Sequence, residues 1–470
     1  MKFFNKVLFK ISFNDKNQVC LGDSLKQNKN FLIKGLVGSG LSFRLLDEFN
    51  KNPKTFLLIF SEAEEAAYYL NDLEYLIGEK NVLFFPSSYR KAYSTEDTDN
   101  SNVLLRSAVL KGLVKNKPKI IVTYSDAISE KIISEHTLKK NTLTINIGMS
   151  ISMDFINESL FEYGFERVDF VTTPGEFALR GGIIDVFSFS NNHPYRIEFF
   201  GDEVQSLRTF NIKNQLSISS LDKIDLLPNT SKISFTDKRK TIIDILPESS
   251  SIISSNIDKI LNRLNLLFKK AENIYKEGNS ILQYPPDKLF VNSNQLIKSL
   301  ESYNHLLLFR SEFIKTDEVL TFKQSPHPIF NKRFDLLVEH LNKNHKDGFD
   351  NYILCTNNQQ VKRLNDIFQE MEITVHYKIL ECPIHSGFED LDSKIACFTD
   401  HQIFGRYHKY SLKSDNTRKN SLSLKELTSM QIGDYVTHTD HGVGKFGGLQ
   451  KIKVKESNQE VIKIIYAEGE

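Results

Sequence analysis

A glycine-rich segment, GLVGSGLS at residues 35–42, stands where a phosphate-binding loop belongs, between a short apolar run and a helical pattern. A working loop reads GxxxxGK[ST], because its lysine reaches the β and γ phosphates and its hydroxyl binds magnesium. The glycines and the hydroxyl are present but a leucine takes the lysine position, in the series Gly35, Gly38, Gly40, Leu41 and Ser42. No acidic pair follows the apolar run 119–124 either. The sequence therefore predicts a degenerate nucleotide fold that does not bind ATP.

The stretch TPGEFALRGGIIDVFSFSNNHPYRIEFFGDEVQSLRTF, residues 173–210, predicts a β-hairpin with a charged solvent face. Its expected arms are 177–189 and 195–200, which are separated by the turn-forming residues SNNHP. Strand alternation puts Ile197 and Phe199 on one face and Arg196 and Glu198 on the other. These residues alone leave open whether the charged face binds a partner or is an ordinary half-solvated sheet.

The segments PGEFALRGGIIDVF and YRIEFFGDEVQSLRTF resemble the UvrA-binding domain shared by the repair protein UvrB and the bacterial transcription-repair coupling factors. The resemblance implies a protein-docking platform whose best contact residues are Arg167 and Arg180, since a guanidinium binds carboxylates bidentately. It also implies four weaker contact candidates on the same sheet, namely Asp185, Phe187, Arg196 and Glu198. Ala178 stands where UvrB has a further arginine, so that contact is expected to be absent.

Near the end of the chain, GDYV at 433–436 and HGVG at 441–444 resemble the RNA polymerase-interacting domain of the coupling factors and of CarD-like regulators. The resemblance implies a small SH3-like or Tudor-like barrel that docks on the polymerase β subunit, with Leu449 and Ile452 near the contact. The short β runs broken by glycines fit part of such a barrel. His438, Asp440 and His441 also invite a metal or acid-base interpretation, but glycines explain the segment as a tight loop, and no metal site is predicted.

Composition places the chain among globular proteins of several domains, with 470 residues, 40% hydrophobic and 25% charged residues. The net charge of +1 gives no global case for nucleic-acid binding. No apolar run is long enough to span a membrane, and the four cysteines form no CxxC pair. We therefore expect a cytoplasmic protein with no catalytic site and no membrane partner.

The pattern of elements predicts an α/β multidomain protein: a degenerate P-loop, helicase-like module interrupted by a β-rich insertion, a second small α/β domain, and a partial barrel. Apolar runs at 31–36, 55–60, 82–85 and 119–124 suit buried parallel strands, and Ser61 with Glu64 predicts a capping box. Residues 255–277 predict a long amphipathic helix. The expected domains are 1–125, 126–208 for UvrA binding, 209–325, 330–410 of unknown role, a linker 411–428, and 429–470.

The resemblance implies the N-terminal portion of a transcription-repair coupling factor, an adaptor that recruits UvrA to RNA polymerase stalled at DNA damage. ATP, Mg and DNA contacts are expected only in motor domains of the full-length parent, so this portion needs no cofactor and is expected to be a monomer. Two alternatives stay open. One is an enzyme, either UvrB itself or an active helicase-like ATPase, which Leu41 and the C-terminal barrel oppose. The other is a free CarD-like regulator, which the UvrB-like body opposes.

Overall fold

The computed structural model divides into two units, residues 1–410 and 411–470, which are considered separately. It describes residues 29–88, 99–114, 117–133, 140–212, 214–229, 239–277, 285–371, 375–406, 433–438, 442–454 and 457–466. The expected linker 411–428 lies outside these ranges.

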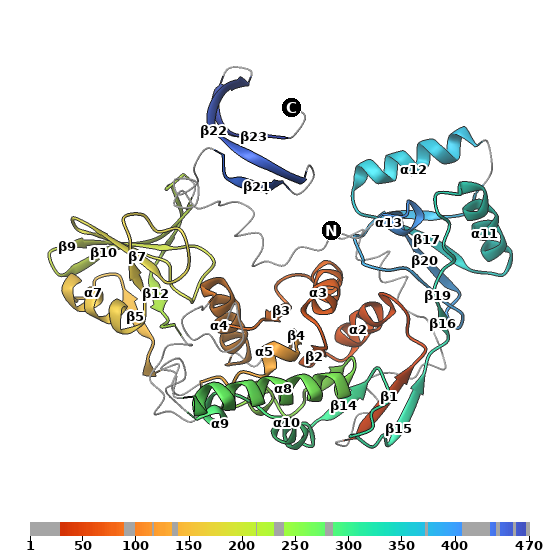
Figure 1. The fold of residues 1–470 in the computed structure, drawn as a ribbon, viewed down its shortest axis with the longest axis horizontal. Helices are drawn as coiled ribbons and strands as arrows, with labels where there is room; N and C mark the ends of the chain where they lie inside the picture. Colours follow the sequence, from red (N-terminus) through yellow and green to blue (C-terminus); the bar gives the residue numbers. More distant parts are fainter. Residues whose placement is uncertain are drawn as a thin grey trace. The chain divides into compact units, whose positions relative to one another are not determined.

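The first unit is built on a seven-stranded sheet in which every pairing is parallel (Figure 1). Its order is β15-β1-β14-β13-β2-β4-β3. The strands are β1 (Asn30–Lys34), β2 (Phe56–Phe60), β3 (Val82–Phe85), β4 (Ile120–Tyr124), β13 (Ser251–Ser254), β14 (Asn304–Leu307) and β15 (Glu318–Thr321). Because β4 and β13 belong to one sheet, the strand-rich residues between them interrupt a single α/β fold.

The helices of this fold are α2 (Gly40–Lys51), α3 (Ala63–Ile77), α4 (Asn100–Val114), α5 (Ser125–Ile128), α8 (Ile257–Lys276), α9 (Pro286–Leu289) and α10 (Ser293–Leu300). The predicted long helix is α8, which Asn256 caps and which buries its apolar stripe. The predicted capping box at Ser61 is wrong. Helix α3 has Glu62 at its N-cap with no side-chain cap, while the Ser61 hydroxyl lies 3.2 Å from that of Ser255.

The inserted segment forms a six-stranded sheet in the order β11-β10-β9-β8-β7-β6, with a separate two-stranded sheet β12-β5 and helix α7 (Met153–Glu162). Its strands are β5 (Leu143–Asn146), β6 (Glu166–Arg167), β7 (Glu176–Arg180), β8 (Ile183–Val186), β9 (Tyr195–Phe200), β10 (Glu203–Phe210), β11 (Ser217–Leu221) and β12 (Lys223–Leu226).

The predicted first hairpin arm, 177–189, is wrong, because it turns back on itself after Arg180. Strands β7 and β8 pair antiparallel around Gly181-Gly182, and Gly181 has a φ of +57°, a value that glycine adopts without a Cβ clash. The segment is therefore a meander of short strands and not one hairpin with a long arm.

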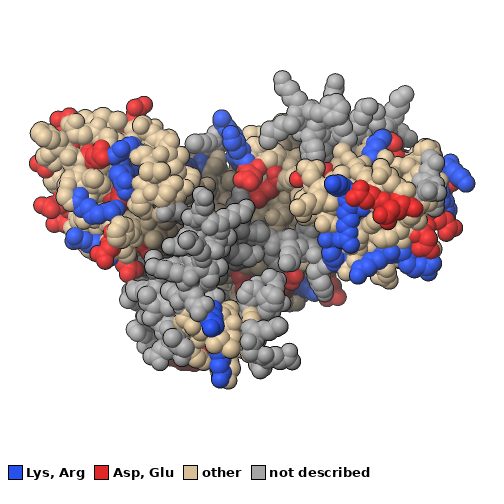
Figure 2. All heavy atoms as spheres, turned by 90° about the horizontal axis from the view of Figure 1, so that it is seen from above, with Lys and Arg blue, Asp and Glu red and all other residues tan. Residues whose placement is uncertain are grey.

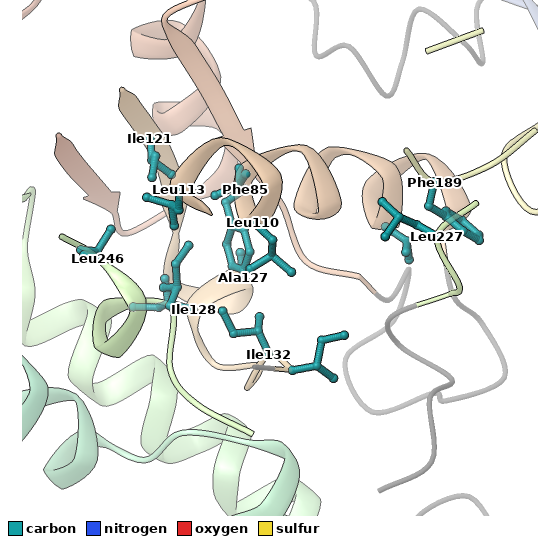
Figure 3. Close-up of a cluster of buried hydrophobic side chains, with 14 of the residues drawn as sticks. Phe85, Leu110, Leu113, Ile121, Ala127, Ile128, Ile132, Phe189, Leu227 and Leu246 are labelled. Atoms are coloured by element: carbon teal, nitrogen blue, oxygen red, sulfur yellow. The ribbon is translucent and has the colours of Figure 1, made fainter. Parts of the chain in front are cut away.

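A continuous apolar cluster joins the inserted segment to the parallel sheet. Figure 3 shows Leu110 and Leu113 of α4 close to Phe85, and Phe189 and Leu227 of the inserted segment beside the same helix. Phe85 and Phe189 are almost completely buried. Burial of a side chain this large contributes roughly 1.5–3 kcal/mol to stability, so the cluster helps to hold the inserted segment to the α/β fold.

Residues from Gln324 to Arg406 form a second α/β sheet in the order β16-β19-β20-β17-β18. Strands β20, β17 and β18 are parallel, β19 pairs antiparallel with β20, and β16 pairs antiparallel with β19. The elements are β16 (Gln324–Ser325), α11 (Phe334–Lys346), β17 (Asp350–Cys355), α12 (Asn358–Glu370), β18 (Lys378–Glu381), β19 (Phe388–Asp390), β20 (Ile395–Thr399) and α13 (Asp400–Ile403).

The second unit contains one antiparallel three-stranded sheet in the order β21-β22-β23. Its strands are β21 (Tyr435–His438), β22 (Gly442–Val454) and β23 (Ser457–Ile465). Tyr435 pairs with Lys445, and Lys445 with Ile465, so the three strands form a meander.

Candidate functional site

One face of the six-stranded sheet carries a row of charged side chains. The register aligns Ala178, Asp185, Arg196 and Arg208 across β7, β8, β9 and β10. The next row on this face contains Arg180 and Glu198, with Ile183 between them. The opposite face holds Phe177, Ile184 and Ile197 in the large core. The predicted separation of Arg196 and Glu198 from the buried Ile197 is therefore confirmed.

Asp185 is the centre of this face. Its side chain is completely buried and accepts hydrogen bonds from Arg196, at 2.7 Å from Nε and 2.9 Å from Nη2, as well as from Arg180. The hydrogen bond to Asp185 raises the pKa of Arg196. The buried carboxylate orients both arginines, because each guanidinium donates a charge-assisted hydrogen bond to it.

The predicted contact residues differ in their access to a partner. Arg180 is 40% exposed and Glu198 is 35% exposed, whereas Arg196 is largely covered. Asp185 and Phe187 are buried, so neither presents its side chain at the surface, and their role as contacts stays a prediction. Asp185 supports the arginines from below, and Phe187 packs with Val171, Ala178 and Phe210 in a small apolar cluster.

Arg167 is exposed but does not join Arg180 on the charged face. Strand β6 pairs with β7 so that Arg167 stands beside Phe177, whose side chain belongs to the opposite, core-facing side. The pleat therefore separates the two arginines, although their strands β6 and β7 are neighbours in the sheet.

Sequence reasoning missed Phe170, which lies over the guanidinium of Arg180 with 4.9 Å between the ring centroid and Cζ. Its side chain is 60% exposed. No local pattern singles out this phenylalanine, which lies in the stretch RVDFVTT, residues 167–173.

The degenerate phosphate loop is filled by residues of the second α/β sheet. The Ser39 amide at the N-cap of α2 donates to the Ser386 carbonyl at 3.1 Å, and the Val37 amide donates to Gln324 Oε1 at 3.2 Å. A Cβ built on Gly38 lies 2.7 Å from the Gly387 carbonyl oxygen. Amides that cradle phosphates in a working loop are thus already hydrogen-bonded within the chain.

The two loop positions that define its chemistry are also buried. Leu41 is 1% exposed. The Ser42 hydroxyl donates to Asp72 at 3.2 Å, and Asp72 also binds the amide and Nδ1 of His385, at 2.8 and 2.7 Å. Ser39 Oγ contacts that same Nδ1 at 3.1 Å, so Ser39, His385 and Asp72 do not have the arrangement of a nucleophilic triad, which uses both ring nitrogens.

Within the described ranges, no group of three or more His, Cys, Asp or Glu side chains could hold a metal ion. Burial raises the pKa of Cys382 well above its usual value, which opposes the thiolate that a metal ligand requires. The side chains of His438, Asp440 and His441 lie outside the described residues.

Leu449 and Ile452, the predicted polymerase contacts, both lie on β22, where they pair with Ile462 and Gln459 of β23. Their side chains are not among those described.

Comparisons with known proteins match two segments of the chain to protein families. Residues 143–231 match the UvrB interaction domain, and residues 430–470 match the CarD-like/TRCF RID domain. The transcription-repair-coupling factor of Bacillus subtilis is 25% identical over 93% of this chain and 43% of that protein. The Staphylococcus aureus protein of the same name (strain bovine RF122) is 22% identical over 97% of this chain and 44% of its own length.

The chain thus spans less than half the length of these curated relatives. None of the described helices is long and apolar enough to cross a membrane. The two domain matches fall, in order, on the charged-sheet segment and on the three-stranded sheet. The chain is a distant homologue of the N-terminal region of the transcription-repair-coupling factors, with a UvrB interaction domain followed by a CarD-like/TRCF RID domain.

Proposed function

We propose that this chain is an adaptor that binds UvrA through the charged face of the six-stranded sheet and RNA polymerase, through its β subunit, with the C-terminal sheet. The observation that carries the proposal is that the match to the UvrB interaction domain, residues 143–231, covers all of the strands that build the charged face. Coupling then consists of holding two partners on one chain.

The chemistry of the charged face suits an acidic partner surface. Arg180 presents a half-exposed guanidinium whose orientation is held by Asp185, and Arg208 pairs with Glu198 nearby. A guanidinium that is already oriented loses little freedom on binding a carboxylate, so more of the contact energy appears as affinity.

In the proposed function, the α/β module does not hydrolyse ATP. The support for this is the combination of Leu41 in place of lysine and the occupation of loop amides by Ser386 and Gln324. The same observations disfavour the alternative of an active UvrB-like or helicase-like ATPase. ATP-driven movement on DNA, which the resemblance implies for the full-length family, is proposed to belong to other parts of the parent protein.

The second α/β sheet receives a role that the sequence did not suggest. We assign it to closing the former nucleotide site, because Ser386, Gly387 and Gln324 occupy the space around the loop. Arg44 of α2 and Asp390 of β19 pair at 2.8 Å across the same junction, and both are buried.

A calorimetric titration of the chain with purified UvrA tests the proposal. We expect a saturable complex, and we expect Arg180→Ala to weaken it by about 2–5 kcal/mol if the guanidinium is a desolvated anchor. Phe155→Ala, on helix α7 behind the sheet, is the matched control and is expected to bind as the wild type does. A loss under about 0.5 kcal/mol for Arg180→Ala counts against the assignment of the surface.

The face in Figure 2 carries basic and acidic side chains next to one another on both large tan regions of the molecule. Together with the net charge of +1, this mixture favours contacts with individual protein surfaces over general attraction to nucleic acid. It is consistent with an adaptor whose specificity lies in a few oriented side chains.

A further inference from the structure

Phe170 and Arg180 form a composite feature at the rim of the charged face. The ring of Phe170 covers one side of the guanidinium, and the carboxylate of Asp185 holds Nη2 of the same group from below. Phe170 is 60% exposed and Arg180 is 40% exposed, so both remain available to a partner.

The loop that presents Phe170 is anchored on both sides. On one side, the Val168 amide donates to the Phe177 carbonyl at 2.9 Å. On the other, Val171 is buried in the small apolar cluster with Phe187. The ring is therefore held at the surface by its neighbours.

Glu176 fixes the remainder of this loop. Its Oε2 accepts hydrogen bonds from the Thr172 and Thr173 amides at 2.7 and 2.8 Å, and from the Thr172 hydroxyl at 3.0 Å. A carboxylate that receives three donors restrains the turn strongly. The exposed ring thus costs little additional ordering when a partner binds it.

We propose that Phe170 and Arg180 act as one recognition element, which takes an acidic side chain of UvrA flanked by apolar surface. The proposal rests on the proposed function. The guanidinium supplies the charge and direction of the contact. The ring excludes water from one side of it and supplies apolar area. Arginine is enriched among the residues that dominate binding energy, and phenylalanine is enriched in interfaces.

The test is a double-mutant cycle in binding to purified UvrA, with the full 470-residue chain. Phe170→Ala is expected to weaken binding about tenfold in the wild-type background and less than about threefold in the Arg180→Ala background. Phe155→Ala is the control, because Phe155 is a comparably exposed phenylalanine, at 52%, on helix α7 of the same domain. It is expected to change affinity less than twofold.

Arg180→Lys separates charge from stacking, since lysine keeps the charge but lacks the planar group that the ring covers. We expect it to lose most of the affinity that Arg180→Ala loses. Circular dichroism melts of every variant should match the wild type, which keeps misfolding from imitating a binding loss.

Three results would overturn the inference. They are an unchanged affinity for Phe170→Ala, equal losses for Phe170→Ala in both backgrounds, or a loss for Phe155→Ala as large as that for Phe170→Ala. If the wild-type chain does not bind UvrA, the proposed function and this inference both fail. If the wild-type chain binds UvrA but one of the three results above is found, this inference alone fails.

Discussion

The buried ion pair between Arg44 and Asp390 gives a quantitative test of how the two α/β sheets are joined. The exposed fractions of the two side chains are 7% and 1%, and the charged atoms are 2.8 Å apart. Burial pushes the pKa of Asp390 upward, but hydrogen bonds from Ser393 and Gln324, together with the nearby Arg44, lower it overall. The carboxylate is therefore charged in the folded protein.

Asp390→Asn keeps the size of the side chain and an oxygen for Ser393, but it removes the carboxylate charge that pairs with Arg44 Nη2 at this buried junction. Removing one partner of a buried ion pair costs about 3–5 kcal/mol, so we expect the free energy of unfolding to fall by that amount. Adding Arg44→Met removes the buried guanidinium as well, and the double variant is expected to recover at least about 2 kcal/mol of the loss.

Urea unfolding followed by far-ultraviolet circular dichroism is the suitable assay, because the chain has no tryptophan. The matched control is Asp392→Asn, whose pair with Lys323 is exposed, at 43% and 68%, and is worth at most about 1 kcal/mol. If Asp390→Asn lowers the free energy of unfolding no more than Asp392→Asn does, the buried ion pair does not hold the two α/β sheets together.

Three further variants, at His305, Leu41 and Gly38, each change a single buried or closely packed residue. Burial lowers the pKa of His305 to about 3, so the unfolded chain takes up a proton first as the pH falls below about 6.5. Stability therefore drops by up to about 1.4 kcal/mol per pH unit from this group, and His305→Gln should show a shallower loss between pH 6.5 and 5 in urea titrations; equal slopes would contradict it. Leu41→Lys should bind no MgATP in a fluorescent-nucleotide titration, since Ser39 and Val37 amides are occupied, and micromolar binding would refute the closed loop. Gly38→Ala should lower the free energy of unfolding by about 1–3 kcal/mol, because Gly38 has a φ of +53° and its Cβ would meet the Gly387 carbonyl; a loss under about 0.5 kcal/mol would show that the contact can relax.

The regular elements were predictable from local pattern. The continuous apolar run of β2 and the apolar stripe of α8, which repeats every 3.6 residues, are both local patterns, and both segments fold as predicted. The capping box at Ser61 failed because the Ser61 hydroxyl lies beside the distant Ser255, and that contact has no local signature. The long hairpin arm failed at Gly181-Gly182, which turn the chain after only five strand residues.

The candidate site was predictable only in part. A resemblance pointed to Arg180, and the structure shows that residue half-exposed on a charged face. Burial of Asp185 could not be inferred, because an aspartate in an alternating strand ordinarily faces water. The filling of the phosphate loop depends on Ser39 meeting Ser386, 347 positions away, and no local pattern encodes such a contact.

We propose that one chain holds UvrA and RNA polymerase at the same time, through separate surfaces. The most direct measurement immobilises the polymerase β subunit, loads the chain on it, and then adds UvrA while surface-bound mass is recorded. The account predicts a second, saturable mass increase that Arg180→Ala abolishes while leaving the loading on the β subunit unchanged. Release of the chain from the β subunit on addition of UvrA, or loss of β-subunit loading in Arg180→Ala, would contradict it.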